Sequence, residues 1–246
     1  MRLTQRIYLV GGGELGFGMS SDPDCHIYAV ETGTGLALVD AGTGLNIESI
    51  LANLRFDGLD PERLRWLFLT HAHADHAGGA AAFRERFDVE VIASTEAAAY
   101  LRAGDEEKIS LPVAKRGGVY PASYSFRACE VAHELCDGET YRAGEAEFRA
   151  YTTPGHCSGM LSFLIEDAGR KCLFSGDTVF HGGKILISNI WDCSLTEYAA
   201  SLRKLAALNV DALLPGHLAI ALSGGSRHIR RANDSMERFA LPPNIL

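Results

Sequence analysis

The stretch Thr70-His71-Ala72-His73-Ala74-Asp75-His76 places three imidazoles and one carboxylate within six consecutive positions. His71 and His73 lie two residues apart, so an extended backbone directs both side chains to the same side. Asp75 and His76 follow at once and can face a second point in space. Imidazole and carboxylate groups are suitable ligands for zinc, and also for iron or manganese. The stretch therefore predicts a metal site.

A predicted buried strand leads directly into this stretch. The run Leu64–Leu69 is mostly apolar, and the histidine cluster begins where the run ends. A solvated histidine cluster would not need an apolar run before it. One such cluster supplies at most four ligands, so a site with two metals needs ligands from elsewhere in the chain.

Three later predicted strand ends supply further candidate ligands. The strand 147–152 is followed by Pro-Gly-His156, the strand 171–174 by Ser-Gly-Asp177, and the strand 210–214 by Pro-Gly-His217. Proline and glycine stop a strand and let the backbone turn, so each histidine emerges at the end of the sheet. Proteins of the α/β class gather their sites at such an edge. The candidate metal ligands are His71, His73, Asp75, His76, His156, Asp177 and His217.

The remaining pattern alternates strands and helices, which predicts an α/β fold. Further strands are predicted at 7–10, 26–31, 36–39, 64–69, 89–93 and 160–165, and helices at 46–55, 77–87, 95–102, 195–208 and 228–239. The glycine-rich stretch 11–18 lacks the helix and the Lys-Ser/Thr pair of a phosphate-binding loop, so a flexible hairpin loop is the better interpretation. Such a loop can close over a site, with Phe17 and Met19 as its apolar tip.

Composition limits the class of protein and its partners. The 246 residues fit one domain, 1–246, in which the irregular segment 104–135 is a candidate lid or substrate-binding insertion. The net charge of −8 argues against nucleic acid as a partner, and no apolar run is long enough to span a membrane. The six cysteines are scattered without a CxxC pair, which favours a reducing, cytoplasmic location.

Taken in order, these motifs resemble those of the metallo-β-lactamase-fold hydrolases. They are Thr70-His71-x-His73-x-Asp75-His76, Pro-Gly-His156, Gly176-Asp177-Thr178 and Pro-Gly-His217, with Asp40 upstream. The resemblance extends from about residue 7 to residue 220. It implies a four-layer αββα sandwich in which the site lies between the two sheets.

The resemblance also implies a dinuclear centre with two Zn²⁺ ions, although iron or manganese remains open. His71, His73 and His156 would bind one metal, and Asp75, His76 and His217 the other. Asp177 would bridge the two, and Asp40 would orient a ligand histidine. A metal-bridging hydroxide would attack an ester-like carbonyl, with Asp75 and Asp177 offsetting the metal charge. Candidates for stabilising the leaving group are Tyr120, Tyr124, His181 and Lys184. We favour His181 because it follows Asp177 closely.

The motifs also separate branches of this superfamily. True class B β-lactamases depart from His-x-His-x-Asp-His at its last position. Glyoxalase II enzymes carry a sizeable helical domain after the last histidine, whereas only 29 residues follow His217 here. The motif spacing suits the small lactonases better. Those enzymes usually carry a tyrosine shortly after the bridging aspartate, and here Phe180 and His181 occupy that neighbourhood.

The prediction is therefore a zinc-dependent hydrolase of a small-molecule ester, lactone or related acyl bond. The alternatives are a glyoxalase II-like thioesterase and a mononuclear iron persulfide dioxygenase. A phosphodiester hydrolase on the same scaffold would be expected to carry a basic surface, and the acidic balance argues against it. A small molecule is the expected partner, and a homodimer is left open.

Overall fold

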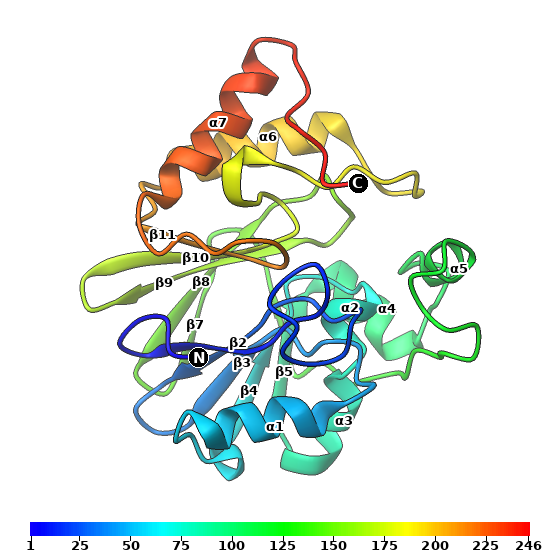
Figure 1. The fold of residues 1–246 in the computed structure, drawn as a ribbon, viewed down its shortest axis with the longest axis vertical. Helices are drawn as coiled ribbons and strands as arrows, with labels where there is room; N and C mark the ends of the chain where they lie inside the picture. Colours follow the sequence, from blue (N-terminus) through cyan, green and yellow to red (C-terminus); the bar gives the residue numbers. More distant parts are fainter.

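Two β-sheets packed face to face form the centre of the molecule (Figure 1), and the computed structural model describes residues 1–246. The first sheet has the strand order β1 (Ile7–Gly11), β2 (Ile27–Glu31), β3 (Leu36–Val39), β4 (Leu64–Phe68), β5 (Glu90–Ser94) and β6 (His133–Leu135). The second has the order β11 (Ala212–Pro215), β10 (Arg170–Gly176), β9 (Leu161–Asp167), β8 (Ala146–Thr152) and β7 (Thr140–Ala143).

Helices cover the outer face of each sheet, so the predicted four-layer sandwich is confirmed (Figure 1). On the first sheet lie α1 (Ile47–Phe56), α2 (Ala74–Ala77), α3 (Ala80–Phe87) and α4 (Thr95–Ala103). On the second lie α6 (Leu195–Ala206) and α7 (Gly225–Glu237), whereas α5 (Leu111–Arg116) stands to one side. Two 3-10 turns, η1 (Pro61–Arg63) and η2 (His181–Gly183), complete the elements.

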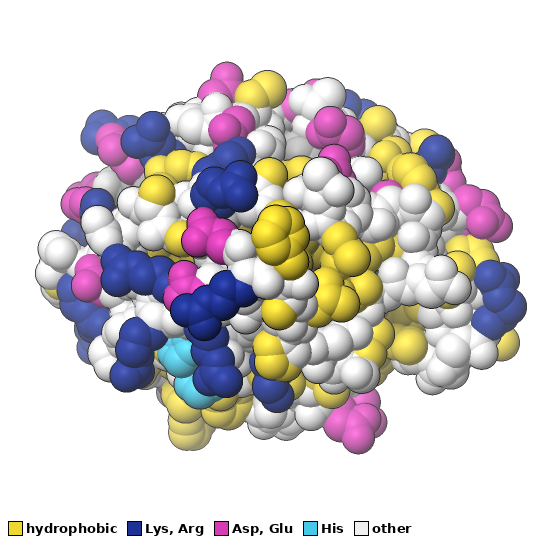
Figure 2. Space-filling model, turned by 90° about the horizontal axis from the view of Figure 1, so that it is seen from above, with side chains coloured by type: hydrophobic (Ala, Val, Ile, Leu, Met, Phe, Trp, Pro, Cys, Tyr) yellow, Lys and Arg dark blue, Asp and Glu magenta, His cyan; other side chains and the backbone are white.

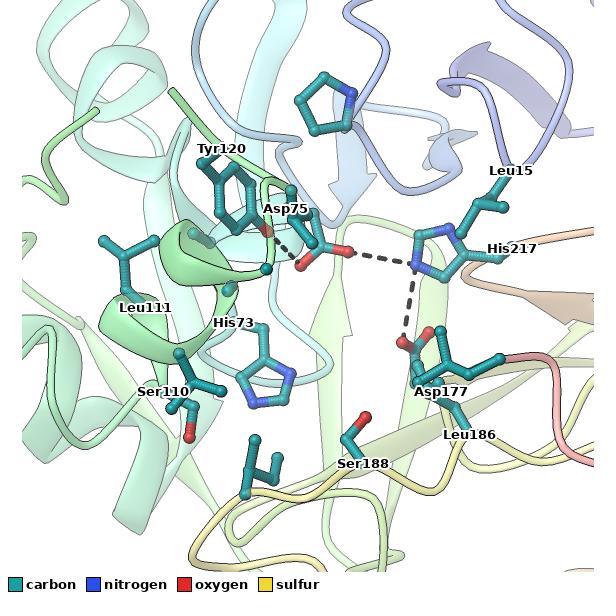
Figure 3. Close-up of a pocket in the computed structure, with 18 of the residues that line it drawn as sticks. Leu15, His73, Asp75, Ser110, Leu111, Tyr120, Asp177, Leu186, Ser188 and His217 are labelled. Carbon is teal, nitrogen blue, oxygen red and sulfur yellow. Dashed lines mark hydrogen bonds and ion pairs between the residues drawn. The ribbon is translucent and has the colours of Figure 1, made fainter. Parts of the chain in front are cut away.

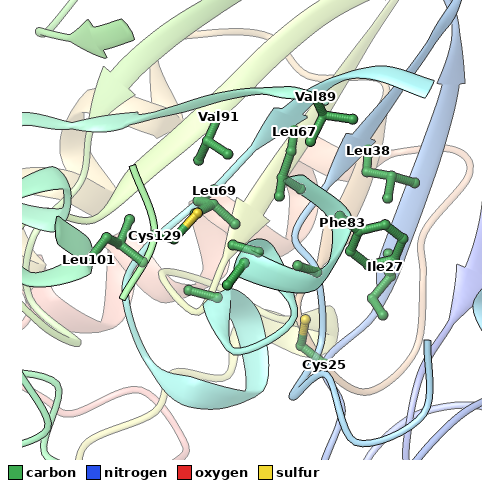
Figure 4. Packing of buried hydrophobic residues seen from close by; sticks show 14 of the residues in the cluster. Cys25, Ile27, Leu38, Leu67, Leu69, Phe83, Val89, Val91, Leu101 and Cys129 are labelled. Carbon is green, nitrogen blue, oxygen red and sulfur yellow. The ribbon is translucent and has the colours of Figure 1, made fainter. Parts of the chain in front are cut away.

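Strand β4 and the residue after it place apolar side chains on both faces of the first sheet. Successive side chains of a strand point to opposite faces, and both faces of this sheet are covered. Leu67 and Leu69 pack into the core beneath the helices, which Figure 4 shows together with Phe83. Phe68 points the other way, into the core between the sheets, and stacks on Phe148 with ring centroids 3.9 Å apart. One strand thus contributes to two cores.

Two predicted segments differ from the structure. The single helix predicted at 77–87 is divided into α2 and α3 at Gly78 and Gly79. A Cβ atom on Gly79 would lie 2.3 Å from the carbonyl oxygen of Ala41, so only glycine permits this close approach. The segment 104–135, in which no regular elements were predicted, contains α5 and β6.

The carboxyl ends of several strands meet at one edge of the two sheets. Strands β3 and β4 are parallel in the first sheet, and β10 and β11 are parallel in the second. The residues that follow these four strands therefore face one another across the junction. At the far side of the second sheet, arginines gather on the surface of α7 (Figure 2). None of the helices combines the length and the apolar character needed to cross a membrane.

Candidate metal centre

All seven candidate ligands come together at the edge where the two sheets meet. Figure 3 shows four of them, His73, Asp75, Asp177 and His217. Four of them follow β4 in the stretch that leads into α2, and the others follow β8, β10 and β11. The side chains of six of the seven are at most 18% exposed to solvent. Asp177 is 1% exposed. The turns that follow these strands thus place polar side chains in a largely buried space.

The first group of ligands consists of His71, His73 and His156. The Nδ1 atom of His73 lies 3.1 Å from Nε2 of His71 and 2.9 Å from Nε2 of His156. The ring of His156 is held in its orientation from the side away from the site, because its Nδ1 lies 3.0 Å from the carbonyl oxygen of Leu186. Three ring nitrogens therefore converge on one point, as in a three-histidine metal site.

The second group consists of Asp75, His76 and His217. The Nε2 atom of His217 lies 3.1 Å from Oδ2 of Asp75, and Nε2 of His76 lies 3.5 Å from the same oxygen. Asp177 lies between the two groups. Its Oδ1 is 3.4 Å from Nε2 of His76, and its Oδ2 is 3.7 Å from Nε2 of His156. One carboxylate thus reaches both groups.

Asp40 holds His76 from behind. Its Oδ2 lies 2.8 Å from Nδ1 of His76, and its Oδ1 accepts a hydrogen bond of 2.8 Å from the backbone N–H of Thr70. Asp40 itself has φ of +62°, a left-handed conformation that is uncommon for residues other than glycine. The carboxylate fixes the ring so that Nε2 faces the site, which is the usual arrangement behind a metal-bound histidine.

The residues fit a pair of divalent cations. Two side-chain atoms that face the site are buried and lack a hydrogen-bond partner, namely Nε2 of His76 and Oδ1 of Asp177. Buried polar atoms are normally paired, so unpaired ones that share a site require an explanation. Nitrogen and carboxylate oxygen donors within 4.8 Å of one another provide it, because together they can coordinate metal ions.

In the metal-free site, burial and neighbouring charges keep His73 neutral and Asp177 ionised, which are the protonation states in which they can bind a metal. Burial lowers the pKa of His73 to about 3, with His156 adding to the effect, so this imidazole is neutral at physiological pH. Burial alone would raise the pKa of Asp177, but His217 and His76 outweigh it and hold that pKa well below its usual range. The site therefore combines a neutral imidazole at His73 with an ionised carboxylate at Asp177.

Zinc affinity should rise with pH over an unusually wide range. Burial acts to lower the pKa of both His76 and His217, but the surrounding carboxylates outweigh it and raise both values in the metal-free protein. Protons on these rings compete with the metal, so each must be lost on binding. We expect the apparent zinc affinity to keep rising above about pH 6.5, where an ordinary histidine has lost its proton. Competitive chelator titrations at several pH values would measure this, and an affinity that levels off below that pH would contradict it.

Comparison with known proteins agrees with this geometry. Residues 22–217 match the sequence profile described as "Metallo-beta-lactamase superfamily". The chain belongs to the metallo-β-lactamase superfamily. It is a hydrolase of that fold. The superfamily profile covers all seven candidate ligands as well as Asp40.

Curated relatives within the superfamily are acyl hydrolases by name. The acyl-coenzyme A thioesterase MBLAC2 of Gallus gallus is 29% identical over 83% of this chain and 75% of its own length. The atrochrysone carboxyl ACP thioesterase of Aspergillus fumigatus is 27% identical over 89% of this chain. A hydroxyacylglutathione hydrolase of Chelativorans sp. is 27% identical over 76% of this chain. This chain spans 58% and 59% of the length of the last two.

Solved structures with the superfamily fold include true β-lactamases. A metallo-β-lactamase of Cronobacter sakazakii superimposes with a TM-score of 0.75 at 21% identity, covering 97% of this chain and 96% of the other. The subclass B3 enzyme BJP-1 of Bradyrhizobium japonicum gives 0.73 at 22% identity, covering 97% and 91% of the two chains. At these identities the likeness shows the fold alone.

The structure places the four candidate leaving-group residues differently from the prediction. His181, which we favoured from its position in the sequence, lies in η2 with an exposed side chain, and its ring centroid is 4.3 Å from that of His228 on α7. Neither His181 nor Lys184 lines the cavity above the metal centre. The reason is that Val179 and Phe180 are buried in the core, which carries the following turn away from the site. The structure therefore does not bring His181 to the metal centre.

Tyr120, another of the four candidates, lies beside the metal centre. Its hydroxyl donates a hydrogen bond of 3.1 Å to Oδ1 of Asp75, and its side chain lines the cavity (Figure 3). Its ring stacks on Tyr124, whose hydroxyl donates instead to the carbonyl oxygen of Thr43. Tyr120 comes from the segment 104–135, far from the ligand motifs in the sequence, so proximity along the chain did not indicate it.

Two residues of β2 and its approach support the site but were not predicted to do so. The hydroxyl of Tyr28 donates to the carbonyl oxygen of Pro215 at 2.7 Å, and Nδ1 of His26 lies 3.1 Å from the same oxygen. The backbone N–H of His26 also bonds to the carbonyl oxygen of Gly216. These contacts hold the turn that presents His217. The contacts of Tyr28 and His26 with Pro215 join residues 187 and 189 positions apart in the sequence, and no local sequence pattern indicates them.

Cys157 lies closer to the centre than its sequence position suggests. Its Sγ is within 4.8 Å of ligand atoms of His71, His73 and His156. Burial raises the pKa of the thiol well above its usual value, so the side chain is protonated and behaves as a small apolar group. The thiol therefore packs as a small side chain beside the ligand His156.

Proposed function

We propose that this chain is a dinuclear, zinc-dependent enzyme that hydrolyses an acyl bond of a small molecule in a reducing, cytoplasmic compartment. The position of Asp177 between the two groups of ligands is the observation that carries this proposal. A single metal would need only one of the two groups. The second group, with its own buried histidines and its own supporting carboxylate, argues for a second cation.

The names of the relatives favour a thioester among the acyl bonds. Two relatives are named as thioesterases and a third as a hydroxyacylglutathione hydrolase. An ester or a lactone would require the same attack on an acyl carbonyl, and therefore the same centre. The proposed substrates are thus thioesters first, with esters and lactones as the wider class.

The geometry suits acyl hydrolysis. Two divalent cations bound there would polarise an acyl carbonyl and lower the pKa of a water molecule between them. The carboxylates of Asp75 and Asp177 would offset the cationic charge, and Asp40 would keep His76 in its binding orientation. Burial and the nearby Asp75 raise the pKa of Tyr120 well above its usual value, so its hydroxyl stays protonated as a hydrogen-bond donor at the substrate side of the site.

The test is a hydrolysis screen in which the release of protons is measured. Zinc-loaded protein would be offered thioesters, esters, lactones and β-lactams, with protein treated with chelator as the blank. We expect metal-dependent turnover of thioesters and esters, at two zinc ions per chain by elemental analysis. Absence of turnover in every class, together with oxygen uptake by iron-loaded protein on persulfides, would instead support the dioxygenase alternative.

Tyr120→Phe should lower kcat for acyl hydrolysis about a hundredfold, the low end of what one positioned proton donor or acceptor contributes. The phenyl ring keeps the stacking on Tyr124 but lacks the hydroxyl that faces Asp75. The matched control is Tyr124→Phe, which removes a hydroxyl of the same stacked pair that bonds to Thr43 instead. Stopped-flow or steady-state kinetics on both variants would measure the effect. Equal losses in the two variants would show that the stack, and not the Tyr120 hydroxyl, supports activity.

A further inference from the structure

The cavity above the metal centre has apolar walls and carries no cationic side chain. Its volume is about 840 Å³, which is the size of a pocket for a drug-sized ligand. Leu15, Leu111, Val113, Leu186 and Ile190 contribute to its walls, from three separate segments of the chain (Figure 3). None of the residues that line it is a lysine or an arginine. An apolar group of a substrate would therefore be well accommodated, whereas an anionic group outside the metal centre would find no lysine or arginine among the lining residues.

The charged residues that line this cavity beyond the metal ligands are all acidic. They are Glu14, Asp22 and Asp24. Asp24 is buried and accepts hydrogen bonds from Thr43 and Ser20, so it has a structural role. Glu14 and Asp22 are exposed, and the backbone N–H of Glu14 bonds to the carbonyl oxygen of Asp22 at 2.8 Å. Two free carboxylates therefore stand together at the mouth of the cavity.

The loop 11–18 thus contributes to the cavity, but not through the residues that were predicted. Glu14 and Leu15 line the cavity, whereas Phe17 and Met19 do not. Phe17 instead lies over His26, with ring centroids 5.4 Å apart. The loop brings one charged and one apolar side chain to the mouth.

Two cations on the neighbouring segments are engaged elsewhere, whereas Arg116 on α5 is exposed and forms no ion pair. Lys115 on α5 pairs with Glu106 at 3.1 Å, and the ammonium of Lys108 lies 4.4 Å from the ring centroid of Trp191. The main arginine cluster of the surface lies on α7 around a separate hollow that includes Arg227, Arg230 and Arg231, and it shares no residue with the cavity (Figure 2). Proteins recognise phosphates and carboxylates with such cations, and this cavity lacks them.

We propose that the cavity selects substrates that combine an apolar acyl chain with a leaving group free of phosphates and carboxylates. It would discriminate against anionic thiol carriers such as coenzyme A and glutathione. This inference rests on the proposed acyl hydrolysis for the reaction, but concerns the choice of substrate. Phosphates of a carrier at the mouth would be repelled by Glu14 and Asp22, and the net charge of −8 adds to the repulsion at long range. Carboxylates of a peptide thiol would meet the same repulsion.

A pair of inert ligands separates this inference from the reaction itself. S-decyl-N-acetylcysteamine and S-decyl-coenzyme A are thioethers with the same alkyl chain and cannot be hydrolysed, and only the second carries phosphates. Calorimetric titration of zinc-loaded protein at about 0.05 M salt should show about tenfold tighter binding of the neutral thioether, because like-charge contacts are unfavourable. The preference should shrink at about 0.5 M salt, where screening lengths fall well below 10 Å.

The double variant Glu14→Gln/Asp22→Asn should reduce the preference by several-fold at low salt. A matched control is Glu62→Gln/Glu166→Gln, which removes two exposed carboxylates near the opposite ends of the strands and should leave the preference unchanged. Equal or tighter binding of S-decyl-coenzyme A by the unmodified protein would overturn the inference, and a weakening of that binding by Lys108→Ala would identify the cation responsible.

The corresponding decanoyl thioesters then report on the proposed function separately. Faster metal-dependent hydrolysis of the neutral thioester would support both proposals. Selective binding of the neutral thioether without hydrolysis of either thioester would support the selectivity and contradict the proposed reaction. Hydrolysis of both thioesters with equal kcat/KM and without a binding preference would support the reaction and contradict the selectivity.

Discussion

Asp177→Asn is expected to lower kcat/KM for acyl hydrolysis about a thousandfold while leaving the fold intact. The asparagine side chain has the same shape but lacks the charge that faces both groups of ligands. Metal-assisted stabilisation is worth several kcal/mol, and about 1.36 kcal/mol corresponds to a factor of ten in rate. The backbone should stay in place, because the carbonyl oxygen of Asp177 accepts a hydrogen bond from Tyr198 that does not involve the side chain.

The measurement pairs steady-state kinetics with elemental analysis and thermal unfolding. The variant should bind less than two zinc ions per chain, and its far-UV circular dichroism should match that of the unmodified protein. Asp211→Asn is a suitable control, because Asp211 is exposed and lies at the other end of β11, where it accepts a hydrogen bond from Lys171. Near-normal activity of Asp177→Asn would rule out the dinuclear centre.

Asp40→Asn should weaken the binding of one zinc ion about 10–100-fold, the usual effect of losing a carboxylate behind a ligand histidine. Asparagine tolerates the left-handed backbone of this position, and its amide oxygen can still accept from the N–H of Thr70. Its amide NH₂ would then face Nδ1 of His76 as a donor. Nδ1 would have to accept, the proton would move to Nε2, and Nε2 could no longer bind a metal.

Zinc titration against a competing chelator would reveal this effect as two distinct affinities in place of two similar ones. Asp88→Asn is the matched control, because Asp88 is an exposed aspartate that also has positive φ, at the end of α3. It tests the backbone consequences of the same substitution away from the site. If Asp40→Asn kept both zinc affinities, then the tautomer of His76 would be set by some other contact.

Much of the candidate site follows from local features of the sequence. Proline and glycine after β8 and β11 end those strands, so His156 and His217 emerge at their tips whatever the rest of the chain does. Parallel pairing then brings such tips to one edge. The apolar run before His71 determined that the central cluster starts from a buried strand. These signals are short-range, and they predicted an α/β fold and the seven residues that the structure brings together. The four-layer sandwich was predicted from the resemblance to the metallo-β-lactamase-fold hydrolases.

The surroundings of the site depended on contacts between distant segments. Tyr120 reaches Asp75 from 45 residues away only because the segment 104–135 folds back over the centre, and His181 is carried off because Phe180 is buried. Glu14 and Asp22 are close in the sequence, but only the packing of their loop places both at the mouth of the cavity. The sequence alone therefore determined the strand ends and the residue types they present. The tertiary structure decided which long-range side chains complete the cavity, because loop packing depends on the whole core and leaves no periodic signal in the chain.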